Sequence, residues 1–593
     1  MPSAAAFATP DAVLAEVIVR RFTSDGADPL ALAAVGVVTR SLELDHVALD
    51  LADPATREEV RVRAGASATP ALASLVAALA AEPALCTMAS AFDDLDDVGP
   101  PLVCVDGRYL YVRRLAAAEY RVARAISDAR DTELALPGGV TDEILARAGA
   151  SLAEELAARG TPSPELVEVA RRCLTRRVSF LTGGPGTGKT WLVTQVLRLL
   201  DRALAEARPT RPVSVVVAAP TGKAARRLAE GLDAALDGGR FAHLVRDRDR
   251  EGSLHHLLGV HPQSRRGAEP LRHDVVVVDE VSMADLVLLD LLLRPGDEGD
   301  ARRVVLIGDP DQLVSVNVGA VLADAVRPEA RTAPLVSRLS TVHRTDRPGV
   351  LDLADAVRRG DVDAVVDQLD AGSPDVAYLT GSRDAALVAY VTAHAARVGE
   401  LARAGDGAGA RAATRAVAVL AAHREGPGSV AWWNAVVGAR YRRPGAAEAG
   451  ERFGVGEPVL VTRNQRSLRL SNGDLGVVIE RDGHRLLYVD EQRVYPVGSV
   501  GFCEPAWAMT IHKSQGSEFD HVVVVLAPPG SPLLTRELLY TGVTRAGRRV
   551  TVVGAREAVA TAVATEVQRV SGLTYRLALG SVDGERGGEQ AGQ

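Results

Sequence analysis

The octapeptide GGPGTGKT at residues 183–190 constrains the fold of this chain more than any other stretch, because it completes the pattern GxxxxGK[ST] between a predicted strand and a predicted helix. The apolar run VSFLT precedes it and the amphipathic run WLVTQVL follows it, so the loop should join a buried strand to a helix. Backbone N–H groups of such a loop converge on an anion, and the helix dipole favours negative charge. The sequence therefore predicts a site for a nucleoside triphosphate, formed by Gly183, Gly184, Pro185, Gly186, Thr187, Gly188, Lys189 and Thr190.

Further residues indicate that the nucleotide is hydrolysed. Lys189 should reach the β and γ phosphates, and the hydroxyl of Thr190 should bind Mg²⁺. The run DVVVVDE (274–280) reads as a buried strand that ends in two carboxylates, where Asp279 would hold Mg²⁺ through water and Glu280 would polarise the attacking water. Gln312, in LIGDPDQL, follows another strand and is placed to sense the γ phosphate. We expect ATP and Mg²⁺ as cofactors.

The pattern of apolar runs predicts an α/β fold with two parallel-sheet nucleotide-fold domains. From residue 178 onward, short apolar strands alternate with helical segments, as in VSVVVAAP followed by KAARRLAEGL, and a second such block follows at 414–424 and 519–554. Short strands around Gly and Asp turns at 455–500 suggest a small β-barrel insertion. Residues 405–415, GDGAGARAATR, read as a loop.

These patterns divide the chain into consecutive parts. We expect a mainly helical N-terminal domain at 1–155, a first nucleotide domain at 156–340 with a small insertion at about 235–273, a second at 341–580, and a disordered tail at 581–593. The N-terminal part carries no catalytic motif and has two apolar helical faces, so it should mainly dock a partner.

The net charge and the N-terminal sequence indicate where the protein is found in the cell but do not identify a substrate. The 593 residues carry a formal charge of −8, so any nucleic-acid site has to be a local groove. The N-terminus MPSAAAFATPD has neither a basic segment nor a following apolar one, which predicts a cytoplasmic protein without a membrane anchor.

Lysine usage singles out the same motif and two others. Only three of the 68 basic residues are lysines, namely Lys189, Lys223 and Lys513. A background that favours arginine retains lysine where a compact ammonium is required. Lys223 lies in APTGKAARRL and Lys513 in TIHKSQGSEF, which reads as two further sites.

Eight stretches occur in the order of the superfamily 1 helicase motifs over roughly residues 165–555. They are GGPGTGKT, APTGKAARRL, SLHHLLG, DVVVVDEVSMAD, LIGDPDQLVSVNVGAVL, STVHRT, AMTIHKSQGSEF and YTGVTRA. The chain resembles in particular the 5′-to-3′ RecD branch, and GRYLYVRRLAAAEYRVARAI is similar to the end of the RecD N-terminal domain. The resemblance implies an ATP-driven DNA helicase that works as the alpha subunit of exodeoxyribonuclease V, with RecB-like and RecC-like partners in a heterotrimer that processes double-strand ends for recombinational repair. It also implies that the two nucleotide domains are RecA-like and that the β-barrel insertion is SH3-like.

The resemblance also assigns roles to single residues. Arg344 in VHRT and Arg545 in VTRA would act as arginine fingers on the γ phosphate. A single DNA strand would follow a track that begins at Thr221 and Lys223, where a helix N-terminus favours a phosphate. Its other members by similarity are His255, His256, Asn464, Thr510, His512 and Lys513. One departure is the stretch ELVEVARRCLTRR, which lacks the glutamine that reads adenine in related helicases.

Alternatives remain at this stage. A nuclease of the D…ExK type needs a lysine beside its carboxylates, and all three lysines belong to motor motifs, so this chain should have no nuclease site of its own. A stand-alone RecD-like helicase would be an active monomer. A structural subunit with a regulatory nucleotide site would not need Glu280, Gln312, Arg344 and Arg545.

Overall fold

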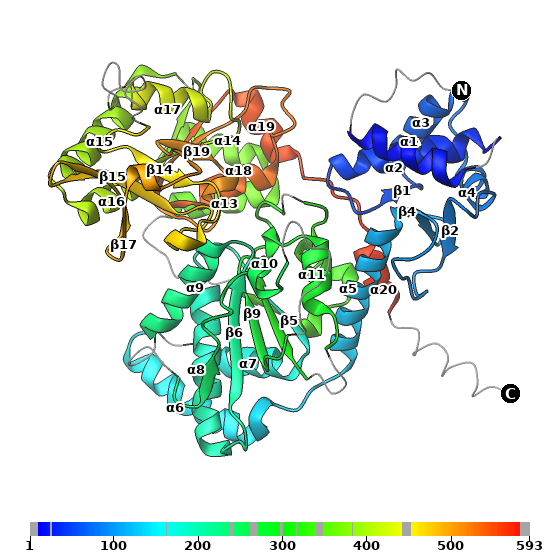
Figure 1. Ribbon diagram of the computed structural model, residues 1–593, viewed down its shortest axis with the longest axis horizontal. Coiled ribbons are helices and arrows are strands. Elements are labelled where there is room, and N and C mark those ends of the chain that lie inside the picture. The colour runs from blue at the N-terminus through cyan, green and yellow to red at the C-terminus, as the bar shows by residue number, and fades with distance from the viewer. Residues whose placement is uncertain are drawn as a thin grey trace.

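The computed structural model describes residues 10–23, 26–161, 163–235, 241–260, 271–296, 301–315, 317–339, 348–381, 383–439, 441 and 452–580. Within these ranges the strands form four sheets, two of them parallel throughout (Figure 1). The expected tail at 581–593 lies outside the described residues, as do 261–270 of the expected insertion.

The N-terminal part combines helices with a small sheet. Its strands β1 (Leu49–Asp50), β2 (Cys86–Ala89), β3 (Leu102–Val105) and β4 (Tyr109–Val112) pair in the order β1-β4-β3-β2. The helices are α1 (Pro10–Phe22), α2 (Pro29–Glu43), α3 (Pro54–Ala64), α4 (Leu72–Ala80) and α5 (Arg113–Asp131). Asp28 and Asp53 cap α2 and α3 and are each followed by a proline, which is the combination that favours a helix start.

The first parallel sheet has the order β11-β5-β10-β9-β6-β7, and β8 also pairs with β6. Its strands are β5 (Val178–Gly183), β6 (Val213–Ala219), β7 (Leu244–Arg246), β8 (Gly252–Ser253), β9 (Val275–Val278), β10 (Arg303–Gly308) and β11 (Val336–Leu339). The helices that follow or cover them are α6 (Asp142–Ala158), α7 (Leu166–Thr175), α8 (Lys189–Ala207), α9 (Gly222–Ala235), α10 (Leu254–Leu257), α11 (Leu286–Leu293) and α12 (Val321–Ala325).

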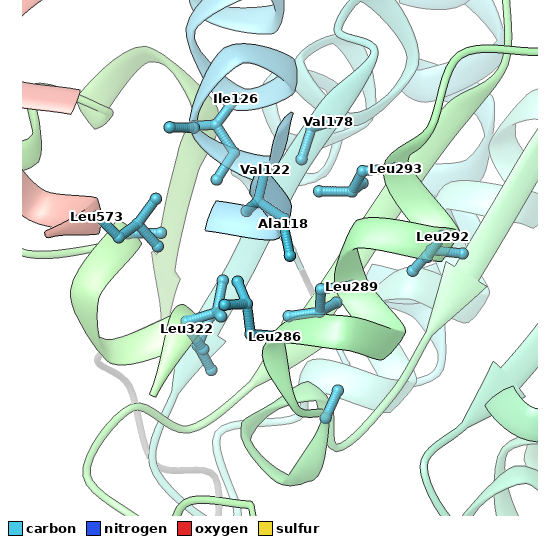
Figure 2. Packing of buried hydrophobic residues seen from close by; sticks show 14 of the residues in the cluster. Ala118, Val122, Ile126, Val178, Leu286, Leu289, Leu292, Leu293, Leu322 and Leu573 are labelled. Carbon is cyan, nitrogen blue, oxygen red and sulfur yellow. The ribbon is translucent and has the colours of Figure 1, made fainter. Parts of the chain in front are cut away.

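Strand β9 shows why an all-apolar run is needed here. Successive side chains of a strand point to opposite faces, so Val276 and Val278 enter one core while Val275 and Val277 enter another. On the first of these faces, α5 packs against α11 and α20 (Leu573–Leu579), as Ala118, Leu289 and Leu573 show in Figure 2. The last helix of the N-terminal region is therefore part of the core of the first parallel sheet.

The second parallel sheet has the order β12-β21-β20-β13-β19. Its strands are β12 (Val376–Leu379), β13 (Val417–Ala421), β19 (Ala508–Thr510), β20 (Phe519–Val525) and β21 (Ala546–Val553). Its helices are α13 (Pro348–Arg359), α14 (Val362–Ala371), α15 (Ala385–Arg403), α16 (Gly407–Ala416), α17 (Val430–Gly438), α18 (Arg536–Thr544) and α19 (Arg556–Ala564). The expected α/β fold with two RecA-like sheets is thus confirmed.

An antiparallel sheet occupies the region where a barrel was expected. It contains β14 (Pro458–Val461), β15 (Leu475–Arg481), β16 (His484–Asp490), β17 (Arg493–Pro496) and β18 (Cys503–Pro505), in the order β17-β16-β15-β14-β18. Between the described strands, no pairing of β17 with β18 closes this sheet into a barrel. The SH3-like barrel therefore stays a prediction.

The prediction of a loop at residues 405–415 is wrong, because Gly407–Ala416 forms helix α16. The side chain of Asp406 accepts a hydrogen bond from the N–H of Gly409 and caps the helix. Ala410 and Thr414 are buried where α16 packs against β15 and β16. Tertiary packing thus outweighs the poor helix propensity of the glycines.

The C-terminal segment returns from α19 to the N-terminal region. The N–H groups of Val47 and Ala48 both donate to the carbonyl of Val570, at 2.9 and 3.1 Å. In Figure 1 the red helix α20 lies beside α5. The side chain of Arg576 on α20 is buried and lies 3.4 Å from the buried carboxylate of Glu119 on α5.

We predict that Arg576→Ala will destabilise the fold by about 3–5 kcal/mol, since it leaves Glu119 as an uncompensated buried charge. Thermal unfolding followed by circular dichroism measures the loss. Arg556→Ala is the control, because Arg556 forms an exposed pair with Asp370, and exposed ion pairs contribute little to stability. Equal melting temperatures for the two variants would contradict the prediction.

No helix among the described residues is long and apolar enough to cross a membrane.

Candidate functional site

The loop between β5 and α8 has the backbone that its glycines permit. Gly186 and Gly188 adopt φ values of 79° and 80°, in the left-handed region that side chains disfavour. A Cβ atom on Gly183 would lie 2.7 Å from the carbonyl oxygen of Leu339. The loop can therefore approach β11 and turn into α8 only with glycine at these positions.

Lys189 and Thr187 hold the loop from inside. The Nζ atom of Lys189 donates to the carbonyl oxygens of Gly183 at 2.6 Å and Gly184 at 2.9 Å, and the hydroxyl of Thr187 donates to Gly184 at 2.8 Å. The ammonium thus lies across the loop, where phosphate oxygens would compete with the carbonyls for its protons.

Thr190 and Asp279 meet at the adjoining strand ends. The hydroxyl of Thr190 donates to Oδ2 of Asp279 at 2.9 Å. Burial, and next the charge of Glu280, raise the pKa of Asp279 to about 6. A divalent cation would reverse this shift, and a hydroxyl with a carboxylate is the oxygen donor set that Mg²⁺ prefers. The two residues therefore fit a Mg²⁺ ion.

Glu280 has an unusual backbone for its residue type. Its φ is 53°, and its N–H donates to Oδ1 of Asp279 at 2.8 Å. A left-handed non-glycine residue costs of order 1–3 kcal/mol and occurs preferentially at functional sites. Here the conformation directs the Glu280 side chain to the wall of the same cavity that Lys189 and Thr190 line.

Residues of the two parallel sheets meet at Gln312. Its Nε2 donates to Asp309 at 3.0 Å, and its Oε1 accepts a hydrogen bond from Nη2 of Arg545 at 3.0 Å. Arg545 follows α18, is 6% exposed, and also donates to the carbonyl of Thr541. The two expected residues, 233 positions apart in the chain, are therefore in direct contact.

A cavity of about 410 Å³ joins these groups. Its walls include Lys189, Thr190, Asp279, Glu280, Gln312 and Arg545. Sequence reasoning missed Trp191 and Arg227, which also line it. Trp191 directly follows the loop motif, and Arg227 lies four residues after Lys223 on α9, so adjacency and helical spacing could have indicated both. Arg344 lies outside the described residues.

Two residues that were expected to contact the DNA strand, Thr221 and Lys223, lie at the start of α9. The hydroxyl of Thr221 accepts a hydrogen bond from the N–H of Ala224 at the first turn of α9, and the ammonium of Lys223 donates to Ser517. Burial, and next the charges of Arg411 and Arg227, lower the pKa of Lys223 to about 7. Lys223 thus connects the first parallel sheet to the segment that follows Lys513.

Three of the other residues expected to contact the DNA strand lie at the end of β19 and in the short helical turn after it, and Asn464 lies after β14. The hydroxyl of Thr510 accepts from the N–H of Lys513 at 3.2 Å, and Lys513 pairs with the carboxylate of Glu504. Burial lowers the pKa of His512. Oδ1 of Asn464 accepts from the N–H of Asn472 at 2.8 Å.

His255 and His256 lie on α10, which directly follows strand β8. Nε2 of His256 is 3.3 Å from the carbonyl oxygen of Asp249. Whether any of these residues binds DNA stays a prediction.

Comparison with known proteins identifies the family. Residues 161–373 match the AAA domain family and residues 505–553 the UvrD-like helicase C-terminal domain family. The fold resembles Pif1 of Bacteroides bound to ssDNA, with 17% identity, a TM-score of 0.39, and coverage of 72% of this chain and 97% of that one.

Two relatives are more similar to this chain in sequence than Pif1 is. The RecBCD enzyme subunit RecD of Mycolicibacterium smegmatis is 39% identical over 81% of this chain and 84% of its own length. The ATP-dependent RecD2 DNA helicase of Deinococcus radiodurans is 33% identical over 68% of this chain and 50% of its own length. The cavity of about 410 Å³, which we call the nucleotide cavity, is lined by residues from both parallel sheets. Because of this arrangement and the extent of the identity, the chain belongs to the RecD family of ATP-dependent DNA helicases.

Proposed function

We propose that this chain is an ATP-driven 5′-to-3′ DNA helicase and the alpha subunit of a RecBCD-like exodeoxyribonuclease V, which unwinds and processes double-strand ends for recombinational repair. The contact between Arg545 and Gln312 supports the motor activity most directly, because each comes from a different parallel sheet and both line the nucleotide cavity. A γ phosphate bound there would join the two sheets, and its loss would release them.

Coupling to DNA requires contacts on both sides of this interface. Lys223 lies on α9, which follows β6 of the first parallel sheet, and Lys513 follows β19 of the second. If each grips a strand phosphate, opening and closing of the nucleotide cavity changes the spacing between the two grips. Sequence-independent phosphate contacts of this kind suit a translocase.

Mg²⁺ would be held by Thr190 and Asp279, where it would neutralise phosphate charge during hydrolysis. Arg344, like Arg545, would contact the γ phosphate. The remaining strand contacts would come from Thr221, His255, His256, Asn464, Thr510 and His512.

Two observations favour a subunit over a stand-alone helicase. The chain is 39% identical to the RecD subunit of Mycolicibacterium smegmatis and 33% identical to the RecD2 helicase of Deinococcus radiodurans. In the N-terminal region, Val13, Leu14 and Val17 of α1 are 58%, 41% and 52% exposed. A row of apolar side chains at helical spacing is costly in water and suits a protein partner, which we propose to be one of the RecB-like and RecC-like subunits of a cytoplasmic heterotrimer.

We predict that the purified chain unwinds a duplex with a 5′ single-stranded tail, and that Lys189→Ala lowers the rate by at least about 100-fold, because it removes a phosphate contact used during hydrolysis. Strand separation of a fluorescently labelled duplex measures the rate. A duplex with a 3′ tail is the matched control, and preference for it would contradict the 5′-to-3′ direction.

The partner proposal has its own test. A tagged chain isolated from its native cells should bring down two other subunits in stoichiometric amounts, and Val13→Asp with Val17→Asp should reduce their recovery. A fully active monomer without partners would favour the stand-alone helicase instead.

A further inference from the structure

A second and larger cavity lies beside the nucleotide cavity. Its volume is about 710 Å³, and α9, α16, the antiparallel sheet and residues 516–520 form its walls. Figure 1 shows α9 and α16 on the same side of the molecule. Arg227, Gly516, Ser517 and Glu518 line both cavities, so the two are neighbours at the same interface.

Six basic side chains line this second cavity. They are Lys223, Arg226, Arg227, Arg411, Arg415 and Arg493. Arg411 and Arg415 are four residues apart on α16 and therefore lie on one face of the helix. Like charges at this spacing repel one another and destabilise a helix, and an anion between them would relieve the repulsion.

Acidic side chains are also present, and they neutralise only part of this set. Asp474 pairs with Arg226 at 2.7 Å and with Arg493 at 3.0 Å, and Asp490 also pairs with Arg493. The other acids in the wall are Glu230, Glu491 and Asp520, which are exposed, and Glu518, which is partly buried. The strong pairs therefore use Arg226 and Arg493 and not the arginines of α16.

Arg411 shows the imbalance most clearly. Its Nε and Nη1 atoms are buried and have no hydrogen-bond partner within the described residues. Burial, and next the charge of Arg415, lower the pKa of Arg411 to about 10. An unpaired buried donor on a charged group costs free energy that an anionic acceptor would recover.

We propose that this second cavity binds a phosphate oxyanion between Arg411, Arg415 and Lys223. A guanidinium offers two parallel donors to phosphate oxygens, and Lys223 on α9, which lines the same cavity, supplies a third contact. Two ligands could supply a phosphate group to this cavity. One is the backbone of the DNA strand near Lys223, and the other is inorganic phosphate leaving the adjoining nucleotide cavity.

The test uses the full chain with its nucleotide cavity saturated by a non-hydrolysable ATP analogue, so that the loop at 183–190 is occupied. Inorganic phosphate is titrated calorimetrically, and a fluorescent oligothymidylate is titrated by anisotropy at several salt concentrations. Arg411→Gln with Arg415→Gln should weaken at least one of the two ligands by about tenfold or more, and for the oligonucleotide should lower the salt slope by about 1–2.

Control variants make the outcome decisive. Arg397→Gln changes an exposed arginine on the neighbouring helix α15 and should leave both titrations unchanged. If the double variant does not fold, Arg415→Gln decides alone, because Arg415 is exposed. Weaker oligonucleotide binding identifies the strand as the source, and weaker phosphate binding identifies the product.

The oligonucleotide arm rests on the proposed helicase function, whereas the phosphate arm does not. A wild-type chain that binds phosphate but no DNA would therefore contradict the helicase and keep the cavity proposal. Unchanged binding of both ligands in the variant, or no binding of either to the wild type, would overturn the proposal.

Discussion

Substitution of Arg545 by alanine is expected to lower kcat for ATP hydrolysis by about 10³-fold or more, which is the range measured when an arginine finger is removed. Arg545 is buried at the boundary between the two parallel sheets and is fixed by Gln312, by the carbonyl of Thr541 and by the carbonyl of Ser517. A planar charge held in this way needs little reorganisation to stabilise charge that develops on the γ phosphate.

The measurement is phosphate release at saturating ATP and saturating single-stranded DNA. Affinity for a fluorescent nucleotide should change by less than about tenfold, because the contact is made mainly in the transition state. Arg545→Lys keeps the charge but loses the planar fork, so an intermediate rate is expected. Unchanged melting temperatures of both variants would show that the loss is not one of folding.

Arg548→Ala provides the matched control. Arg548 lies three residues further along the chain and is 77% exposed, beside Asp520. Its removal should leave kcat unchanged. Hydrolysis by Arg545→Ala within about tenfold of the wild-type rate would contradict the assignment, since a group stabilising the transition state cannot be lost at so small a cost.

Parts of the site that depend on local sequence could be predicted from it. The loop at 183–190 requires a strand before it and a helix after it, and β5 and α8 occupy those positions. Asp279 and Thr190 also meet as expected, because the parallel strands of one sheet release their carboxyl ends at the same edge. The alternation of short apolar runs with helical segments predicted both parallel sheets, because it too is a local property of the sequence.

Contacts between distant segments could not be predicted in this way. The sequence motifs and their resemblance assigned Gln312 and Arg545 to the γ phosphate separately, but their mutual hydrogen bond depends on how the second sheet docks on the first. The second cavity was missed because Arg411 and Arg415 lie in the glycine-rich stretch that was expected to be a loop. Packing against α15, β15 and β16 stabilises that stretch as a helix and places Arg411 and Arg415 on one face.

Glu280→Gln is expected to separate nucleotide binding from hydrolysis. If Glu280 polarises the attacking water, its loss should lower kcat by about 10²–10⁴-fold, the usual contribution of a general base. Glutamine keeps the size of the side chain and its place in the cavity. The left-handed backbone at φ 53° strains glutamine and glutamate alike. Binding of a fluorescent ATP analogue should therefore stay within about threefold of the wild type.

Single-turnover hydrolysis provides the rate of the chemical step, and Glu329→Gln is the control, since Glu329 is exposed and lies outside the nucleotide cavity. The variant should also remain bound to single-stranded DNA in the presence of ATP, because the γ phosphate that joins the two sheets persists. Loss of nucleotide binding together with hydrolysis would mean that Glu280 supports the Asp279 metal site, while an unchanged single-turnover rate would exclude it as the base.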